Sequence, residues 1–269
     1  MQRKIVAIGG GHNGRIKDDG TKSPYETGPM DLEIIRLAEK EKPNFLFIAH
    51  SQTNPESEKN YYETMRRIYA DMYGCDCRTI TREQLENNDI NIVNDIEWAD
   101  IIYEGGGDTK SMMELWLKTG FDKILRKAWE TGKVMCGVSA GGNCWFKSCS
   151  SDSLKIQLKD DTAPLINVEC LNLVNAFFTP HCDVVDENTN RLEHQKDSLK
   201  DKELVGIAIS NCAAIEIIDD EYRLITSDAG DYGIEAYGLK TYWRDGKYVE
   251  EYIDKSNKFK NLKDLLKVQ

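Results

Sequence analysis

The chain has 269 residues, of which 40% are hydrophobic and 30% are charged, and its formal net charge is −11. This composition disfavours nucleic acid and anionic membranes as partners, because neutralising phosphates requires a basic surface. No apolar run approaches the roughly 20 residues of a membrane helix, and the N-terminus lacks the apolar core of a signal peptide, so we expect a cytoplasmic protein.

The first half of the chain alternates short apolar runs with amphipathic segments. The spacing predicts strands over 4–9, 44–50, 75–81, 100–104 and 133–138, and helices over 30–42, 56–73 and 111–131. Strand, helix, strand, helix is the order that builds a parallel sheet with helices on both faces.

After about residue 165 the pattern changes to strands joined by tight turns. Five more strands are predicted, over 205–210, 213–218, 222–226, 238–243 and 248–253. We therefore expect a single domain over 1–269, with a core at about 3–218 and an antiparallel, β-rich C-terminal extension at 219–269.

The cysteines predict neither a disulfide framework nor a metal site. Cys136, Cys144, Cys170 and Cys212 lie in apolar stretches, and the sequence has no pair of CxxC motifs. We expect reduced cysteines that pack as small hydrophobic side chains, and no metal or cofactor.

Glycines follow three of the predicted strands, at 9–11, 105–107 and 137–142. Ligands in parallel sheets bind at the carboxyl ends of the strands, and these three segments would open onto one edge. In the last segment Gly137-Val138-Ser139-Ala140-Gly141 fits G-x-S-x-G, a sharp strand-to-helix turn that lifts a serine out of the sheet. The alternative is an ordinary serine-glycine turn, but its place after a buried strand favours a nucleophile.

A serine nucleophile needs a base and an oxyanion hole. Of the four histidines, His181 follows an apolar segment and Pro180, which fixes the local backbone, so it is the best candidate base. His12 and His50 could also approach the same edge, whereas His194 is typical of a solvated helix face. The Ala140 N–H and an amide of the 105–107 run are candidate oxyanion donors, although the run could also be a plain tight turn.

Four blocks together resemble the peptidase E family of serine peptidases, which includes α-aspartyl dipeptidases and cyanophycinases. They are residues 5–11, 105–109, 137–143 and 180–181, and the resemblance spans about 3–218. It implies a three-layer α/β/α sandwich similar to class I glutamine amidotransferases, with a mainly parallel sheet and the chain order serine, histidine, acid.

Carried over by position, the resemblance makes Ser139 the nucleophile and His181 the base. Gly106, Gly107 and Ala140 would form the oxyanion hole. Asp108, where many relatives have asparagine, and Thr109 would contact the substrate.

The third member of the triad departs from the family pattern. Asn211 stands where relatives have glutamate, Glu216 lies five residues on, and Asp183 is two residues after the base. Asparagine can hold the imidazole tautomer but hardly stabilises its charged form. The sequence therefore leaves all three residues open as the orienting group.

Arg191 resembles the family arginine that pairs with a substrate aspartate, because guanidinium grips carboxylate with two hydrogen bonds. The alternative is a surface arginine on a helix. The leading hypothesis is a serine exopeptidase or dipeptidase that hydrolyses small peptides and prefers an N-terminal aspartate. A weak or inactive peptide-binding protein and a glutamine amidotransferase-like enzyme are the alternatives, and the aromatic C-terminal extension could form a homodimer contact.

Overall fold

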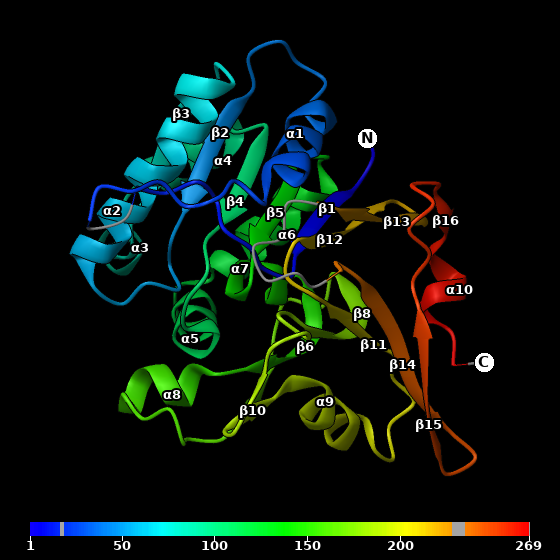
Figure 1. Cartoon of the computed structure of the whole chain (residues 1–269). Helices are drawn as coiled ribbons and strands as arrows, with labels where there is room; N and C mark the ends of the chain where they lie inside the picture. Colours follow the sequence, from blue (N-terminus) through cyan, green and yellow to red (C-terminus); the bar gives the residue numbers. More distant parts are fainter. Residues whose placement is uncertain (17–18, 228–234, 269) are drawn as a thin grey trace.

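The computed structural model describes residues 1–16, 19–227 and 235–268, and these residues form two large β-sheets that pack together and one two-stranded sheet (Figure 1). The first sheet has the strand order β16-β13-β12-β1-β5-β4-β2-β3, and the second has the order β15-β14-β11-β8-β6-β7. The predicted α/β sandwich is present. The single-domain division with an extension at 219–269 stays a prediction, and residues 228–234 and 269 lie outside the described part.

The first sheet has a parallel centre and an antiparallel edge. Its parallel strands are β1 (Lys4–Ile8), β5 (Val134–Val138), β4 (Ile101–Glu104), β2 (Asn44–Ile48) and β3 (Asp76–Ile80). Its antiparallel strands are β12 (Ala213–Ile218), β13 (Glu221–Thr226) and β16 (Lys260–Asn261).

The second sheet is where the structure differs from the sequence prediction. Its strands are β6 (Phe146–Ser151), β8 (Val174–Thr179) and β11 (Gly206–Ile209), which are parallel, and β7 (Ile166–Glu169), β14 (Gly238–Arg244) and β15 (Lys247–Tyr252), which are antiparallel. The predicted antiparallel extension is thus divided between two sheets. Periodicity predicts that a strand exists but not which partner it pairs with.

Helices cover both faces of the first sheet. One face packs against α1 (Gly28–Leu37), α2 (Pro55–Arg66) and the π-helix η1 (Arg67–Met72). The other face packs against α3 (Arg82–Glu86), α4 (Asn91–Trp98), α5 (Thr109–Thr119), α6 (Phe121–Glu130) and the second sheet. In β1, Val6 and Ile8 point to the first of these layers while Ile5 and Ala7 point to the second, as a strand buried on both faces requires.

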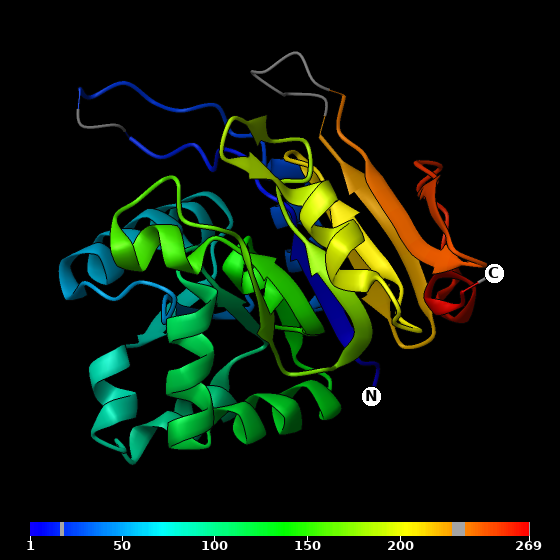
Figure 2. The same cartoon turned by 90° about the horizontal axis from the view of Figure 1, so that it is seen from below.

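Shorter elements complete the fold. They are α7 (Ala140–Asn143), α8 (Ser153–Leu158), β9 (Val185–Asp186), β10 (Thr189–Asn190), α9 (Arg191–Leu199) and α10 (Leu262–Leu266). Figure 2 shows α9 lying across the second sheet, on the side away from the first sheet. The predicted helix over 111–131 is two helices, because Gly120 adopts a φ of 75° and ends α5.

The edge where β1, β4 and β5 end also meets the ends of β8 and β11. The residues that follow these two strands donate to the first glycine loop: His181 N–H to the Gly9 carbonyl oxygen at 3.2 Å, and Cys212 N–H to that of Gly10 at 3.0 Å. These bonds join the two sheets at the predicted site. Within the described residues, no helix has the length and apolar character to cross a membrane, and no His, Cys, Asp and Glu cluster is suited to a metal.

Candidate active site

Ser139 lies at the sharp turn between β5 and α7. Its φ of 56° and ψ of −111° are unusual for a side-chain-bearing residue and cost about 1–3 kcal/mol. Its N–H donates to the Ile8 carbonyl oxygen, 3.0 Å away, which fixes the turn against β1. Gly141 is required here, because a Cβ at that position would lie 2.0 Å from the Glu104 carbonyl oxygen. Close packing on both sides therefore holds the serine in its strained conformation.

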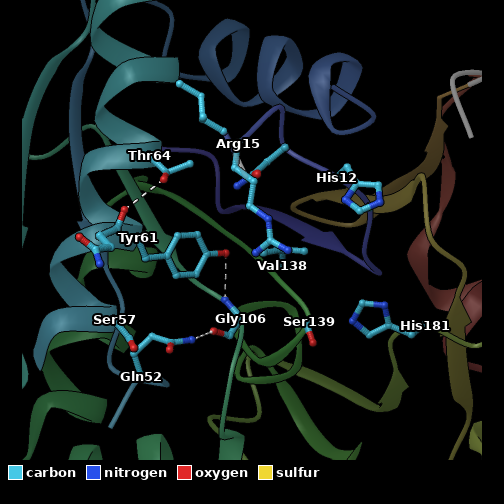
Figure 3. A pocket seen from close by; sticks show the side chains of 14 residues that line it. His12, Arg15, Gln52, Ser57, Tyr61, Thr64, Gly106, Val138, Ser139 and His181 are labelled. Atoms are coloured by element: carbon cyan, nitrogen blue, oxygen red, sulfur yellow. Dashed lines mark hydrogen bonds between the residues drawn. The ribbon is translucent and has the colours of Figure 1, made fainter. Parts of the chain in front are cut away.

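A cavity of about 500 Å³ opens beside Ser139. It is lined by the loop 11–16, by the first turns of α2, and by Ser139 and His181, which face the same space (Figure 3). A second cavity of about 560 Å³ lies next to it and shares His12 and His181. The imidazole of His181 thus stands between two spaces that could hold parts of a ligand.

His181 is hydrogen bonded to Asn211. The two atoms are His181 Nδ1 and Asn211 Oδ1, 2.8 Å apart. A carbonyl oxygen can only accept, so Nδ1 carries the proton and Nε2 has a free lone pair. The pair therefore presents the tautomer that a general base for a serine requires.

Gly10 explains why glycines follow β1. A Cβ on Gly10 would lie 2.1 Å from Asn211 Oδ1 and 2.3 Å from His181 Nδ1. Any side chain at this position would displace the hydrogen-bonded pair. Glycine at this position therefore lets the backbone pass close to the candidate base, His181.

The environment lowers the pKa of His181 below the ordinary histidine value. Burial is the largest cause, because it disfavours the charged imidazolium, and the positive charge of Arg191 acts in the same direction. The Asn211 hydrogen bond and the carboxylates of Asp152 and Asp183 oppose the shift. The neutral, basic form of His181 consequently persists to lower pH than in a free histidine.

Of the predicted oxyanion donors, Gly106 and Ala140 lie beside the serine, whereas Gly107 does not line the cavity and packs against Ser51. Gly106 N–H donates to the Tyr61 hydroxyl at 3.2 Å, and its carbonyl oxygen accepts from Gln52 Nε2 at 2.6 Å (Figure 3). Ala140 N–H is the first amide of α7, where a helix offers no backbone acceptor. Burial raises the pKa of Tyr61 to about 12, so its hydroxyl stays protonated.

Glu216 does not reach the imidazole, and the sequence prediction that offered it as an orienting acid is corrected. It lies on β12 opposite Val6 and is fully buried. Its carboxylate contacts Arg223 at 2.5 Å and Arg36 at 3.8 Å. The side chain therefore belongs to a charged cluster between β12, β13 and α1.

Asp108 and Thr109 are also directed away from the cavity. Asp108 caps α5 by accepting from Ser111 N–H at 3.0 Å and from Gln157 Nε2 at 2.8 Å. The Thr109 hydroxyl accepts from Asn143 Nδ2 at 3.0 Å. Both residues are 1% exposed, so their side chains are already hydrogen bonded within the protein and are not available to a substrate.

Arg191 is buried rather than on a helix surface. It begins α9, is 5% exposed, and forms an ion pair with Asp152 at 2.6 Å. It does not line the cavity that contains Ser139. Arg191, which was expected to bind a substrate carboxylate, is therefore already paired with the carboxylate of Asp152.

The remaining histidines differ from one another. His50 is fully buried between the Trp116 indole N–H and the Ile80 carbonyl oxygen, and burial lowers its pKa to about 3. His194 bonds the Ser150 hydroxyl at 2.8 Å, so it is not a solvated helix residue. His12 lines the cavity, as the sequence allowed.

Arg15, Gln52 and Tyr61 are among the cavity residues that sequence reasoning missed. Arg15 reaches into the cavity from the loop 11–16, and its guanidinium has no ion-pair partner among the described residues (Figure 3). Apolar periodicity predicts which side of a helix is buried, but it carries no signal for polar residues at the rim of a cavity.

The chain is similar in sequence and in fold to several peptidases. The chain is 28% identical over 230 residues to an uncharacterized peptidase, YgaJ, of Bacillus subtilis (strain 168), covering 85% of this chain and 89% of that one. It shares its fold with a crystal structure of a peptidase from an acI-B1 actinobacterium, at a TM-score of 0.66 and 16% identity, with 96% of each chain covered. A Listeria monocytogenes EGD-e protein assigned provisionally to peptidase E matches at a TM-score of 0.55 and 19% identity, over 84% of this chain and 99% of that one. The model of peptidase family S51 matches residues 20–225, and the chain therefore belongs to this family of serine peptidases.

Proposed function

We propose that the protein is an exopeptidase or dipeptidase that cleaves short peptides through an acyl-enzyme on Ser139. The observation that carries the proposal is the strained serine facing the same cavity as an imidazole whose Nδ1 proton is held by Asn211. A cavity of about 500 Å³ suits a short peptide better than an extended chain.

In the first step the Ser139 hydroxyl oxygen attacks the peptide carbonyl carbon while His181 Nε2 takes the hydroxyl proton. The C–N bond then breaks, and His181 returns the proton to the leaving amine. In the second step a water molecule, deprotonated by His181, attacks the acyl-enzyme; the ester C–O bond then breaks, the free acid leaves, and His181 returns the proton to the Ser139 oxygen. Asn211 keeps the imidazole in the required tautomer throughout.

The negative charge on the attacked carbonyl oxygen needs amide donors. Ala140 is the first candidate, and Gly106 joins it when the substrate oxygen replaces the Tyr61 hydroxyl as its acceptor. The Tyr61 oxygen thus marks a position near Ser139 that an oxygen acceptor can occupy.

An acidic preference follows from Arg15 rather than from Arg191. Arg191 is committed to Asp152, whereas Arg15 projects into the cavity beside Ser139. A peptide with an N-terminal aspartate would place its side-chain carboxylate against this guanidinium.

A glutamine amidotransferase-like activity is disfavoured. That chemistry uses a cysteine at the turn, and the turn has Ser139. The neighbouring Cys136 and Cys144 are buried, and burial raises the pKa of both thiols well above the ordinary range, so neither is a reactive thiolate.

The decisive experiment combines labelling with hydrolysis. A fluorophosphonate should label the wild type and not Ser139→Ala, and dipeptides with Asp, Glu, Leu, Ala or Gly at the N-terminus should be cleaved only by the wild type. Absence of both labelling and cleavage, together with thermal stabilisation by a peptide, would establish the inactive binding protein instead.

The acidic preference has its own test. Arg15→Ala should raise KM for Asp-initiated dipeptides by about tenfold and leave Leu-initiated ones unchanged, because one charge-assisted contact is lost. Lys22→Ala is the matched control, since Lys22 is a cation that pairs with Ile16 of this loop but does not line the cavity. An equal change for both substrates would refute a specificity role.

A further inference from the structure

Asp183 lies directly behind the Asn211 amide, on the side away from His181. Asn211 Nδ2 donates to both carboxylate oxygens of Asp183, at 3.2 Å and 3.1 Å. The backbone N–H of Asn211 donates to the same carboxylate at 2.8 Å. Three hydrogen bonds therefore hold the carboxylate against this one residue.

The carboxylate fixes which way the amide of Asn211 points. An ionised carboxylate only accepts hydrogen bonds, so it must face the NH2 group. The amide oxygen is then left for His181 Nδ1, 2.8 Å away. Without Asp183 the amide could rotate by half a turn and offer a donor to Nδ1, which would favour the wrong imidazole tautomer.

We propose that Asp183 is a positioning residue: it orients Asn211, and by polarising the Asn211 amide it favours positive charge on His181. Ser139, His181, Asn211 and Asp183 then form one linked series. This proposal rests on the proposed function of Ser139 and His181. In a partly buried site, linked hydrogen bonds polarise one another, so the carboxylate strengthens the Asn211 oxygen as an acceptor and stabilises the imidazolium that forms during the reaction.

Other charged groups act on His181 as well. Arg191, at the start of α9, disfavours the imidazolium, while Asp152, before α8, favours it. Glu26 and His12 lie across the neighbouring cavity. The contribution of Asp183 must therefore be measured as a difference between variants rather than from one titration.

The first test is Asp183→Asn. We expect kcat to fall about tenfold or more, with KM nearly unchanged, because each pKa unit of lost imidazolium stabilisation is a factor of ten. The acid limb of kcat/KM should move to lower pH, since a carboxylate that favoured the charged imidazole is gone. Asp186→Asn is the matched control, because Asp186 is an exposed carboxylate in the same connection between β8 and α9, and its side chain accepts from the Asn188 N–H rather than from Asn211.

The second test exchanges the two groups. Asn211→Asp should also lose activity, because it sets two carboxylates about 3 Å apart, where they cannot both stay ionised. The double variant Asp183→Asn/Asn211→Asp puts a carboxylate on the imidazole and an amide behind it. It should recover at least about tenfold over either single variant, since coupled residues are not additive.

Nitrogen NMR of the histidine rings gives a readout that needs no substrate. In the wild type His181 should show the Nδ1-protonated tautomer, and Asp183→Asn should show mixed tautomers and a lower pKa. Unchanged kcat, pH profile and tautomer in Asp183→Asn would overturn the proposal, and so would a double variant as impaired as the two losses multiplied. If the wild type fails to cleave peptides and resists fluorophosphonate, the proposed function falls, while the NMR result still decides the role of Asp183.

Discussion

Ser139 and His181 reach the same cavity from two different kinds of structure. Ser139 stands on the first sheet, where residues within the turn and the adjoining strand ends set its geometry, such as Gly141 packed on Glu104. His181 follows a strand of the second sheet and lines the same cavity as Ser139 because the sheets pack together and bond through Gly9. The proposed nucleophile is thus positioned by local structure, whereas the proposed base depends on tertiary packing.

The largest expected effect tests whether these two halves act as one unit. Ser139→Ala and His181→Ala should each reduce kcat by about 10⁴-fold or more, and the double variant should lose little beyond that, because neither group acts without the other. Steady-state kinetics on an Asp-initiated dipeptide measures all three. Losses that multiply in the double variant would mean that the two residues work independently.

A second prediction breaks only the tertiary half. Gly10→Ala should reduce kcat by about 100-fold, because its Cβ displaces the His181–Asn211 pair and misplaces the base by about an ångström. Fluorophosphonate labelling and thermal unfolding should be followed alongside kinetics. Gly246→Ala is the control: the φ of 73° at this position makes an added side chain costly to stability, but that side chain faces open space in the turn after β14 and not the His181–Asn211 pair. Equal activity of the two variants would contradict the prediction.

The pH profile sharpens the comparison further. Because burial lowers the pKa of His181, the acid limb of kcat/KM should have its midpoint below the value of about 6.5 for a free histidine. The sign follows from the neutral imidazole being the active form: a lower pKa keeps it neutral as the pH falls. A midpoint above 6.5 would show that the carboxylates of Asp152 and Asp183 outweigh burial.

The smallest effect on activity is expected at Glu216. Glu216→Gln should leave kcat/KM within about twofold, because its side chain contacts Arg223 and not His181. The free energy of unfolding, measured in urea, should fall by about 1 kcal/mol or more, since a buried ionic partner of Arg223 is lost. A loss of activity comparable with that of His181→Ala would return Glu216 to the triad.

The local half of the site was predictable from the sequence, and the reason is physical. The elbow around Ser139 needs small residues within five positions, so the requirement appears as a contiguous motif. All five parallel strands of the first sheet were predicted, and for four of them the reason is similar, because burial on both faces gives continuous apolar runs.

The tertiary half was predictable only in part. His181 and Asn211 could be named as candidates, but the pairing of Asn211 with Asp183 joins residues 28 positions apart and has no sequence period. Arg191 looked like an exposed helix residue, because its partner Asp152 is also distant in the chain. Strand pairing was not predictable for the same reason: β13 and β14 are consecutive strands in the chain but belong to different sheets.

The connection 210–212 leaves the second sheet at β11 and enters the first at β12, and Asn211 is its middle residue. A small sliding of one sheet against the other would therefore separate His181 from Ser139 while every strand stayed intact. Heat should thus abolish peptide cleavage at a lower temperature than it abolishes the far-ultraviolet circular dichroism of the strands. Peptide cleavage would then report whether the two sheets are aligned.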